Sequence, residues 1–242
     1  MTELSGEGLY YRTVRKELSA WEKQMLKRPG VANRASKALQ GKIHGIVPQK
    51  AQDMITASVK TLIETVITGS GLLDKREPAV SPTLAESDYL AERAFEVYYR
   101  TAVAQGIGFG LGGVLINLAD FPALMSIKVK FLFDCAKLYG YDVHERNERL
   151  FILHVFQLAF CGDSRRLEVY RIIKEWDKRA DDISLDWERL QIEYRDYLDI
   201  AKLLQLLPIV GAVAGGAANH NLMKKLKVTA VNCYRLRYLA KT

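Results

Sequence analysis

The chain has 242 residues, of which about half are hydrophobic and a quarter are charged, and its formal net charge is +7. This composition excludes a chain that is disordered as a whole and provides enough apolar surface for one large domain. The three cysteines are far apart in the sequence, so we expect no disulfide framework and a reducing compartment. The sequence shows no secretory signal or lipidation motif, and we therefore expect a cytoplasmic protein.

The two ends of the chain are basic and its middle is acidic. Residues 1–52 carry a net charge of +6, residues 53–199 one of −6, and residues 200–242 one of +7 with no acidic residue. Basic ends can contact an anionic membrane surface, nucleic acid or the acidic middle. The motifs of nucleic-acid-binding domains are missing, so we expect no nucleic-acid partner. Six cations are candidates for an anionic surface contact: Arg149, Lys224, Lys225, Lys227, Arg235 and Arg237.

Helical periodicity begins early in the chain. The basic region over residues 1–50 is expected to be helical. Apolar residues from Ile55 to Ile67 recur at helical spacing, and Gly69 and Gly71 predict the end of that helix.

A loop and two long helices are predicted next. Charged residues and two prolines favour an internal loop over residues 74–88. Asp88 is the predicted N-cap of a helix that runs into a glycine-rich segment, residues 101–119. Pro122 opens the following helix, and Gly140 is its predicted C-cap.

Helices continue to the end of the chain. Residues 146–161 predict a strongly apolar helix, and Asp163 or Ser164 is the predicted cap of the next one. A second glycine-rich segment, residues 203–223, leads into a basic amphipathic helix. Because no stretch alternates as a β-strand does, we predict an all-α fold, with residues 1–242 as one domain of eight or nine helices.

The two glycine-rich segments contain no charged residue. Glycine costs about 1 kcal/mol in a helix interior relative to alanine, so these glycines need a compensating contact. Small residues four apart let two helix backbones approach closely. We therefore predict two apolar helices packed against each other, or each against a copy of itself in a homo-oligomer. The glycines expected in this packing are Gly106, Gly108, Gly110, Gly112, Gly211, Gly215 and Gly216.

Two other interpretations of these segments compete with packing. Both segments approach the ~20 residues of a membrane-spanning helix. Polar residues interrupt them, however, and we favour buried helices over a membrane-dipping hairpin or true spans. A dinucleotide-binding loop would need a preceding strand, whereas a helix precedes residues 106–113.

Blocks of sequence in a fixed order carry a resemblance to a known family: Gly41–Pro48, Gly112–Leu124, Tyr139–Asp142, Glu148–Leu153, Phe156–Phe160, Glu193–Asp196, Leu207–Asn219 and Tyr234–Arg237. On these blocks the chain resembles the EcsC family nearly end to end. That family takes its name from a bacterial operon whose other products look like the ATPase and the permease of an ABC transporter. The resemblance therefore implies ABC transporter subunits as partners, and it implies no catalytic residue. One departure is His220, where the resemblance leads us to expect an aromatic residue.

Four polar residues are candidates for catalysis. Asp120 follows the first glycine-rich segment, where the competing interpretation is a helix N-cap. Glu193 and Asp196 share one helix face beside Arg195. An ion-pair cluster with Arg149 or with the basic C-terminus competes there with a hydrolytic site.

The histidines and cysteines give no sign of a metal site or a nucleophile. His144 and Glu148 are four residues apart, but no second histidine completes a ligand set. His154 lies in an apolar helix and is expected to be a core histidine, and the cysteines are expected to be buried thiols. We predict neither a metal nor a cofactor.

These observations favour a non-enzymatic accessory or regulatory protein that associates with an ABC transporter and lies peripherally at the cytoplasmic face of the membrane. Two alternatives stay open. One is a hydrolase that uses Asp120, or the Glu193 and Asp196 pair, together with Arg195. The other is a protein that binds a lipid or another apolar ligand in a cavity lined by the glycine-rich helices.

Overall fold

The computed structural model describes residues 6–27, 49–73, 77–80, 82–109, 121–179 and 211–241. Every regular element in these ranges is a helix, which confirms the predicted all-α fold. The eight helices are α1 (Gly6–Met25), α3 (Gln49–Thr68), α4 (Leu84–Phe109), α6 (Phe121–Leu138), α7 (Arg146–Phe160), α8 (Asp163–Lys174), α9 (Trp176–Arg179) and α11 (Gly211–Lys241).

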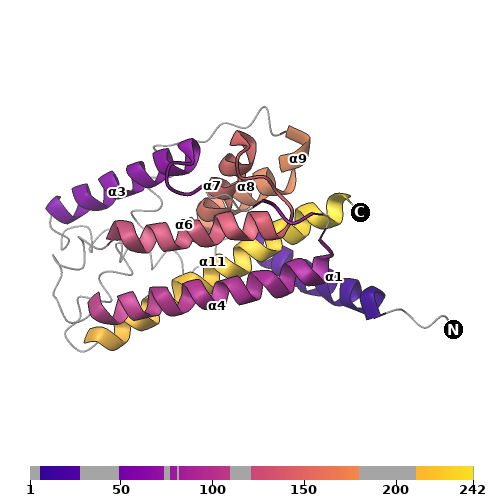
Figure 1. Cartoon of the computed structure of the whole chain (residues 1–242), viewed down its shortest axis with the longest axis horizontal. Coiled ribbons are helices and arrows are strands. Elements are labelled where there is room, and N and C mark those ends of the chain that lie inside the picture. Colours follow the sequence, from indigo (N-terminus) through magenta and orange to yellow (C-terminus); the bar gives the residue numbers. More distant parts are fainter. Residues whose placement is uncertain are drawn as a thin grey trace.

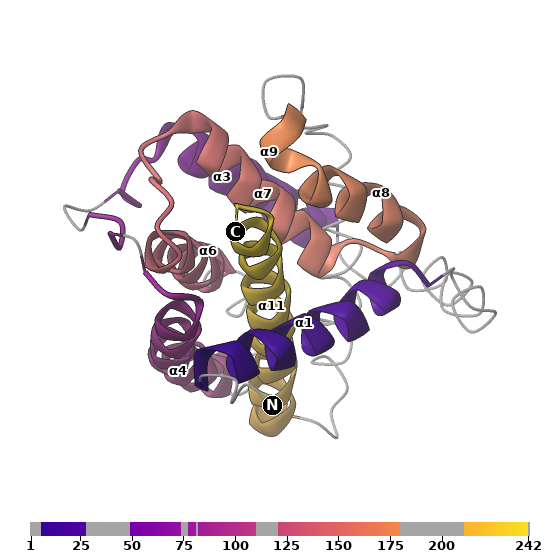
Figure 2. The same ribbon diagram turned by 90° about the vertical axis from the view of Figure 1, so that its right-hand side faces the viewer.

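Helix α11 runs through the centre of the fold (Figure 1). It packs most extensively against α4 and α7, and it also contacts α1, α6 and α8. Helix α3 lies on the outside, against α6 and α7. In the end-on view, α1 crosses α11 obliquely and extends from α4 toward α8 (Figure 2).

Helix α4 begins four residues before Asp88, the residue that we predicted as its N-cap. Thr83 and Glu86 form a capping box: the Glu86 N–H donates to Thr83 Oγ1 over 3.2 Å, and the Thr83 N–H donates to the Glu86 carboxylate over 3.0 Å. The predicted cap was therefore wrong, because this box satisfies the free N–H groups of the first turn one turn earlier. The helix starts inside residues 74–88, the segment that we predicted as a loop, and Asp88 lies within it with a nearly buried side chain.

Glycines with positive φ end two helices as predicted. Gly69 (φ 73) follows α3, and Gly140 (φ 80) follows α6. At Gly140 a Cβ would also lie 3.1 Å from the Ala79 carbonyl oxygen, so the segment before α4 packs closely against this turn. At the start of α8 the prediction was wrong. The N-cap is Gly162, because this residue (φ −67, ψ 160) is the extended one before the first turn. The predicted caps, Asp163 and Ser164, already lie inside the helix.

Helices α4 and α11, which carry the glycine-rich segments, run antiparallel. Tyr99 of α4 hydrogen bonds to His220 of α11, and Glu92 pairs with Lys227. Seven residues separate the two partners on each helix, in opposite directions along the chain. The glycine-bearing end of α4 and the glycine-bearing end of α11 therefore lie at the same end of the pair (Figure 1).

The packing of the glycines on one another stays a prediction. Gly106 and Gly108 lie in the last turn of α4, and Gly211, Gly215 and Gly216 lie in the first two turns of α11. Gly110 and Gly112 lie outside the described residues. None of the helices in the described ranges combines the length and apolarity needed to cross a bilayer.

Helix α7 is buried almost throughout. Every residue from Leu150 to Phe160 is buried, as expected of a helix that is apolar all round and lies in the core of a protein. His154 is 2% exposed and packs on the Trp176 ring, with 5.3 Å between the ring centroids. The predicted core position of this histidine is confirmed.

Candidate functional site

Two arginines of α11 organise the buried polar groups of the core. Arg235 and Arg237 are two residues apart, so their side chains project to nearly opposite sides of the helix. Each guanidinium contacts two carboxylates from other helices. We name the two clusters after their buried carboxylates. The Asp88 centre comprises Asp88, Arg235, Glu17, Tyr10 and Tyr139, and the Glu148 centre comprises Glu148, Arg237, Asp177 and Tyr234.

In the Asp88 centre, one carboxylate accepts hydrogen bonds from α11, from α1 and from Tyr139 in the turn after α6. Arg235 Nε lies 3.1 and 3.0 Å from the two Asp88 oxygens, and the hydroxyls of Tyr10 and Tyr139 donate to the same group. Arg235 also contacts Glu17 of α1 at 2.9 Å. Burial disfavours the charged guanidinium, but these partners outweigh burial and raise the pKa of Arg235. The centre thereby ties α1 and α4 to α11.

In the Glu148 centre, Arg237 joins α7 to α9. Its Nη1 lies 2.6 Å from Glu148 and its Nη2 lies 2.6 Å from Asp177, while the Tyr234 hydroxyl donates to Glu148 over 2.8 Å. The guanidinium also stacks 3.8 Å from the Tyr141 ring centroid. Burial raises the pKa of Glu148, an effect that Arg237 opposes. Burial disfavours the charge on Arg237 as well, yet its partners raise its pKa.

Two cysteines lie next to these centres without the properties of nucleophiles. Cys135 and Cys233 are fully buried, and burial raises the pKa of both thiols. A buried thiol with a raised pKa is rarely present as the reactive thiolate. Cys161 is also buried and forms no disulfide. The prediction of core thiols is confirmed.

Arg149, a candidate for ion pairing or for an anionic surface contact, binds backbone carbonyl groups. Its Nε donates to the Ile67 oxygen over 2.8 Å, and its Nη1 donates to the oxygens of Val143 (3.0 Å) and His144 (2.5 Å). The Ile67 carbonyl belongs to the last turn of α3, where a cation is electrostatically favourable. The side chain thus links the end of α3 to the turn before α7.

The remaining anionic-contact candidates lie on the outer part of α11. Lys224 and Lys225 are exposed. Lys227 is partly buried, where it pairs with Glu92 and lies 4.9 Å from the Phe95 ring centroid. An anionic surface contact is therefore sterically open at the first two lysines, and it stays a prediction.

The four catalytic candidates, Asp120, Glu193, Arg195 and Asp196, lie outside the described residues, so the hydrolytic site also stays a prediction. Within the described ranges, no three histidine, cysteine or acidic side chains come together in a set that could hold a metal ion.

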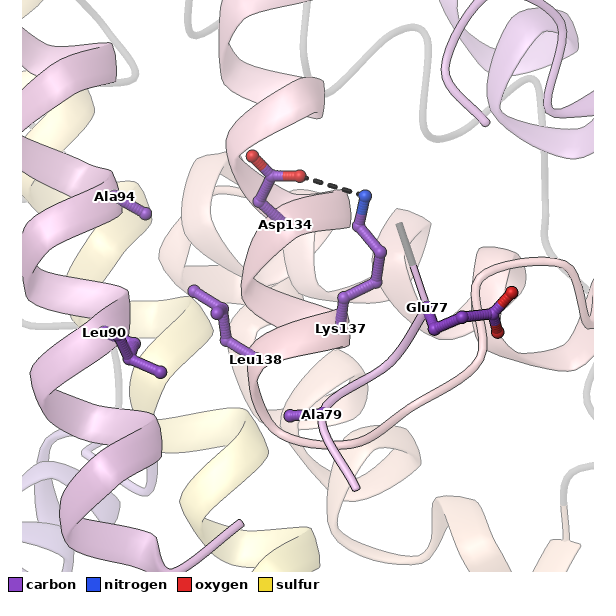
Figure 3. Close-up of a pocket in the computed structure, with 7 residues that line it drawn as sticks. All are labelled: Glu77, Ala79, Leu90, Ala94, Asp134, Lys137 and Leu138. Carbon is purple, nitrogen blue, oxygen red and sulfur yellow. Dashed lines mark ion pairs between the residues drawn. The ribbon is translucent and has the colours of Figure 1, made fainter. Parts of the chain in front are cut away.

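A pocket of ≈ 250 Å³ lies between α4 and α6 (Figure 3). On its α6 side, Asp134 and Lys137 form an ion pair of 3.1 Å, and the Tyr98 hydroxyl donates to Asp134 over 2.7 Å. Both charged side chains are buried. Leu90 and Ala94 of α4 face this pair across the pocket. The full lining consists of Glu77, Ala79, Leu90, Ala94, Asp134, Lys137 and Leu138.

Sequence reasoning missed these polar residues. Asp88 was assigned to a helix terminus, and the charged residues of α6 were not considered at all. Three of them are buried: Lys128, Asp134 and Lys137. Burial lowers the pKa of Lys128 to about 7. A charged residue within an apolar helical run is the signal that could have found them, because a buried charge needs a partner or becomes neutral.

Comparison with known proteins gives matches over nearly the whole chain. The model of the EcsC protein family matches residues 12–239. Protein EcsC of Bacillus subtilis (strain 168) is 39% identical over 226 residues, which cover 93% of this chain and 95% of that protein. The uncharacterized protein YdbA of the same organism is 32% identical over 155 residues, 62% of this chain and 57% of that protein. No solved structure matches the chain.

Proposed function

Because the chain belongs to the EcsC protein family, we propose that it is a non-enzymatic accessory or regulatory protein of an ABC transporter, acting at the cytoplasmic face of the membrane. The observation that carries the proposal is the family match, which spans residues 12–239. The operon from which that family takes its name supports the choice of ABC transporter subunits as partners. The accessory role requires a binding surface, and it requires no reacting group.

The buried charges support a binding role over a catalytic one. In the Asp88 and Glu148 centres, the charged groups form ion pairs between helices of the same chain. Breaking a pair that is buried on both sides, such as Arg237 with Glu148, typically costs about 3–5 kcal/mol. The two centres are therefore part of the scaffold. Lys224 and Lys225 are exposed cations, at positions that an anionic partner can reach.

The test uses a candidate partner ABC transporter, with its ATPase and permease subunits, purified and reconstituted in nanodiscs. We expect the full chain to co-elute with the nanodiscs and to change the ATPase rate at least twofold. A Lys224→Glu/Lys225→Glu variant should lose most of this effect. The matched control is Lys60→Glu/Lys130→Glu, which changes the net charge equally at two other exposed positions. Neither co-elution nor a changed rate with the unmodified chain would overturn the proposal.

A second candidate function is the binding of a small apolar or amphiphilic ligand in the pocket between α4 and α6. The observation that favours it is an apolar wall opposite a buried ion pair, the pattern of an oriented ligand site. With ≈ 250 Å³ the pocket lies below the ~300–1,000 Å³ of drug-sized ligand sites, so we expect a ligand of the size of a single short acyl chain.

Calorimetric titration with octanoate tests this second function. We expect binding to the unmodified chain and none to an Ala94→Trp variant, in which the indole fills the pocket. Ala104→Trp serves as the control because Ala104 is exposed on the same helix and does not line the pocket. Equal binding by the two variants, or none by the unmodified chain, would exclude this site.

A further inference from the structure

Helix α1 separates its charges between two faces. Two of its three carboxylates are used within the molecule: Glu17 contacts Arg235 of α11 at 2.9 Å, and Glu22 contacts Lys174 of α8 at 2.8 Å, while Glu7 in the first turn is exposed. The apolar side of the helix is buried against the same neighbours through Val14, Leu18 and Trp21.

The cations of this segment point the other way. Five of them are exposed: Arg12, Arg15, Lys16, Lys23 and Lys27. Three of these, at positions 12, 16 and 23, fall within about 40° of one another around the helix axis, given 3.6 residues per turn, and Lys27 lies two residues after the end of the helix. The acidic residues between Gly6 and Lys27 all lie at other angles. The outer face of α1 therefore carries a stripe of positive charge about 17 Å long from Arg12 to Lys23, at 1.5 Å per residue.

Two leucines flank the stripe. Leu9, in the first turns of α1, is 58% exposed, and Leu26, just after its end, is 52% exposed. Exposed leucines beside lysines and arginines are the composition of a helix that lies in a membrane interface.

Lys224 extends the same surface onto α11. Eleven residues complete about three helical turns, so Lys224 lies on the side of α11 from which Arg235 reaches Glu17 of α1. Val228, between the two positions, is 46% exposed. Helix α1 contacts this side of α11 at Arg235 through Glu17, and Lys224 is exposed about three turns away along α11; Figure 2 shows α1 crossing α11.

From this arrangement we infer that the outer face of α1, together with Lys224, rests on an anionic lipid bilayer. The inference depends on the membrane location in the proposed function, and it names the contacting surface. The cations lie at the level of the lipid phosphates, and Leu9 and Leu26 enter the boundary of the acyl chains. Nucleic acid would match the cations but leave both leucines in water.

The test measures co-sedimentation of the full chain with vesicles at low salt. We expect binding to vesicles of phosphatidylcholine with 30% phosphatidylglycerol, none to pure phosphatidylcholine, and loss of binding in 0.5 M salt. A Lys16→Glu/Lys23→Glu variant should bind at least ~30-fold more weakly. Each lysine near an anionic surface strengthens binding by about fivefold to tenfold, and the variant removes two of them. The control Lys60→Glu/Lys130→Glu, on α3 and α6, should bind within about threefold of the unmodified chain, because distant charges are screened.

Equal loss of binding in the two variants would overturn the inference, since net charge alone would then explain binding. The same holds if the unmodified chain does not bind the vesicles, or binds a double-stranded RNA fragment more tightly. A chain that binds vesicles through α1 but leaves the transporter ATPase rate unchanged would remove the transporter role and keep the membrane face. An unmodified chain that changes the ATPase rate but does not bind the vesicles would keep the transporter role and remove the membrane face.

Insertion of Leu9 gives an independent readout. A Leu9→Cys variant carrying an environment-sensitive dye should show a blue-shifted emission on anionic vesicles, because the three native cysteines are buried and stay unlabelled. An Ala57→Cys variant, labelled at an exposed position of α3, should show no shift. Equal shifts at the two positions would contradict the assignment of α1 as the contacting face.

Discussion

Tyr139 and Tyr234 stack with their ring centroids 5.4 Å apart and their planes inclined by 17°. The hydroxyl of Tyr139 donates to Asp88, and the hydroxyl of Tyr234 donates to Glu148. The stacked rings therefore connect the Asp88 centre to the Glu148 centre. This contact lies in the middle of the core, where α4, α6, α7 and α11 meet.

The hydroxyl of Tyr234 should contribute measurably to stability. Its removal in Tyr234→Phe leaves the buried Glu148 without one donor, and we expect a loss of about 1–3 kcal/mol in the free energy of unfolding. Urea unfolding followed by circular dichroism measures it. Tyr89→Phe is the control, since Tyr89 is 60% exposed and its substitution should stay within about 0.5 kcal/mol. Equal effects would contradict the assigned role of Tyr234.

Removing one partner of the Arg237–Glu148 ion pair should destabilise the protein more than replacing both partners by apolar residues. Arg237→Met leaves Glu148 buried without its cation, and we expect a loss of about 3–5 kcal/mol. A double variant, Arg237→Met/Glu148→Leu, removes both charges and should recover most of that loss in the same urea titration. A double variant as unstable as the single one would show that the pair itself supplies the stability.

The capping box at the start of α4 should be visible in a single substitution. Thr83→Ala removes the acceptor of the Glu86 N–H, and we expect a loss of about 1 kcal/mol on thermal or urea unfolding. Thr101→Ala, at an exposed threonine within the same helix, should change stability by less than about 0.5 kcal/mol. An unchanged Thr83→Ala variant would place the start of α4 elsewhere.

The stability of the protein should fall as the pH drops from about 6.5 toward 4. Burial lowers the pKa of His154 to about 4, so the unfolded chain takes up a proton in this range and the folded chain does not. His154→Phe should flatten the dependence of the unfolding free energy on pH between 6.5 and 5. Gln24→Ala, at an exposed position without a titratable group, should leave the slope unchanged. Equal slopes in His154→Phe and the unmodified chain would contradict the shift.

A slope of the same sign is expected above neutrality from Lys128. Burial lowers the pKa of its ammonium group to about 7, whereas the unfolded chain keeps the ordinary value near 10.5. The unfolded state therefore binds more protons above pH 7, and stability should rise with pH there. Lys128→Met should remove that rise between pH 7 and 8.5, before the thiols of the unfolded chain titrate. A rise that persists in the variant would show that another group causes it.

Much of the fold could be predicted from local patterns. Apolar spacing located α3 and α7, and the glycines at 69 and 140 marked the ends of two helices correctly. These features depend on neighbours within one or two turns, so they are visible in the chain itself. The missed start of α4 was also local: Thr83 and Glu86 form a recognisable capping box, and Asp88 was chosen in their place.

The sequence by itself determined the helical class, the ends of α3 and α6, the extent of α7 and the EcsC family. The tertiary structure decided which charges are buried and with what. Arg235 and Asp88 are 147 residues apart, and Arg237 and Glu148 are 89 apart. With 35 basic and 28 acidic side chains, the sequence allows a very large number of pairings. The choice among them depends on which helices pack together, because ion pairs act only over a few ångströms. Helix packing brings Glu17 and Glu22 of α1 into contact with Arg235 and Lys174, and it leaves the cations of α1 exposed.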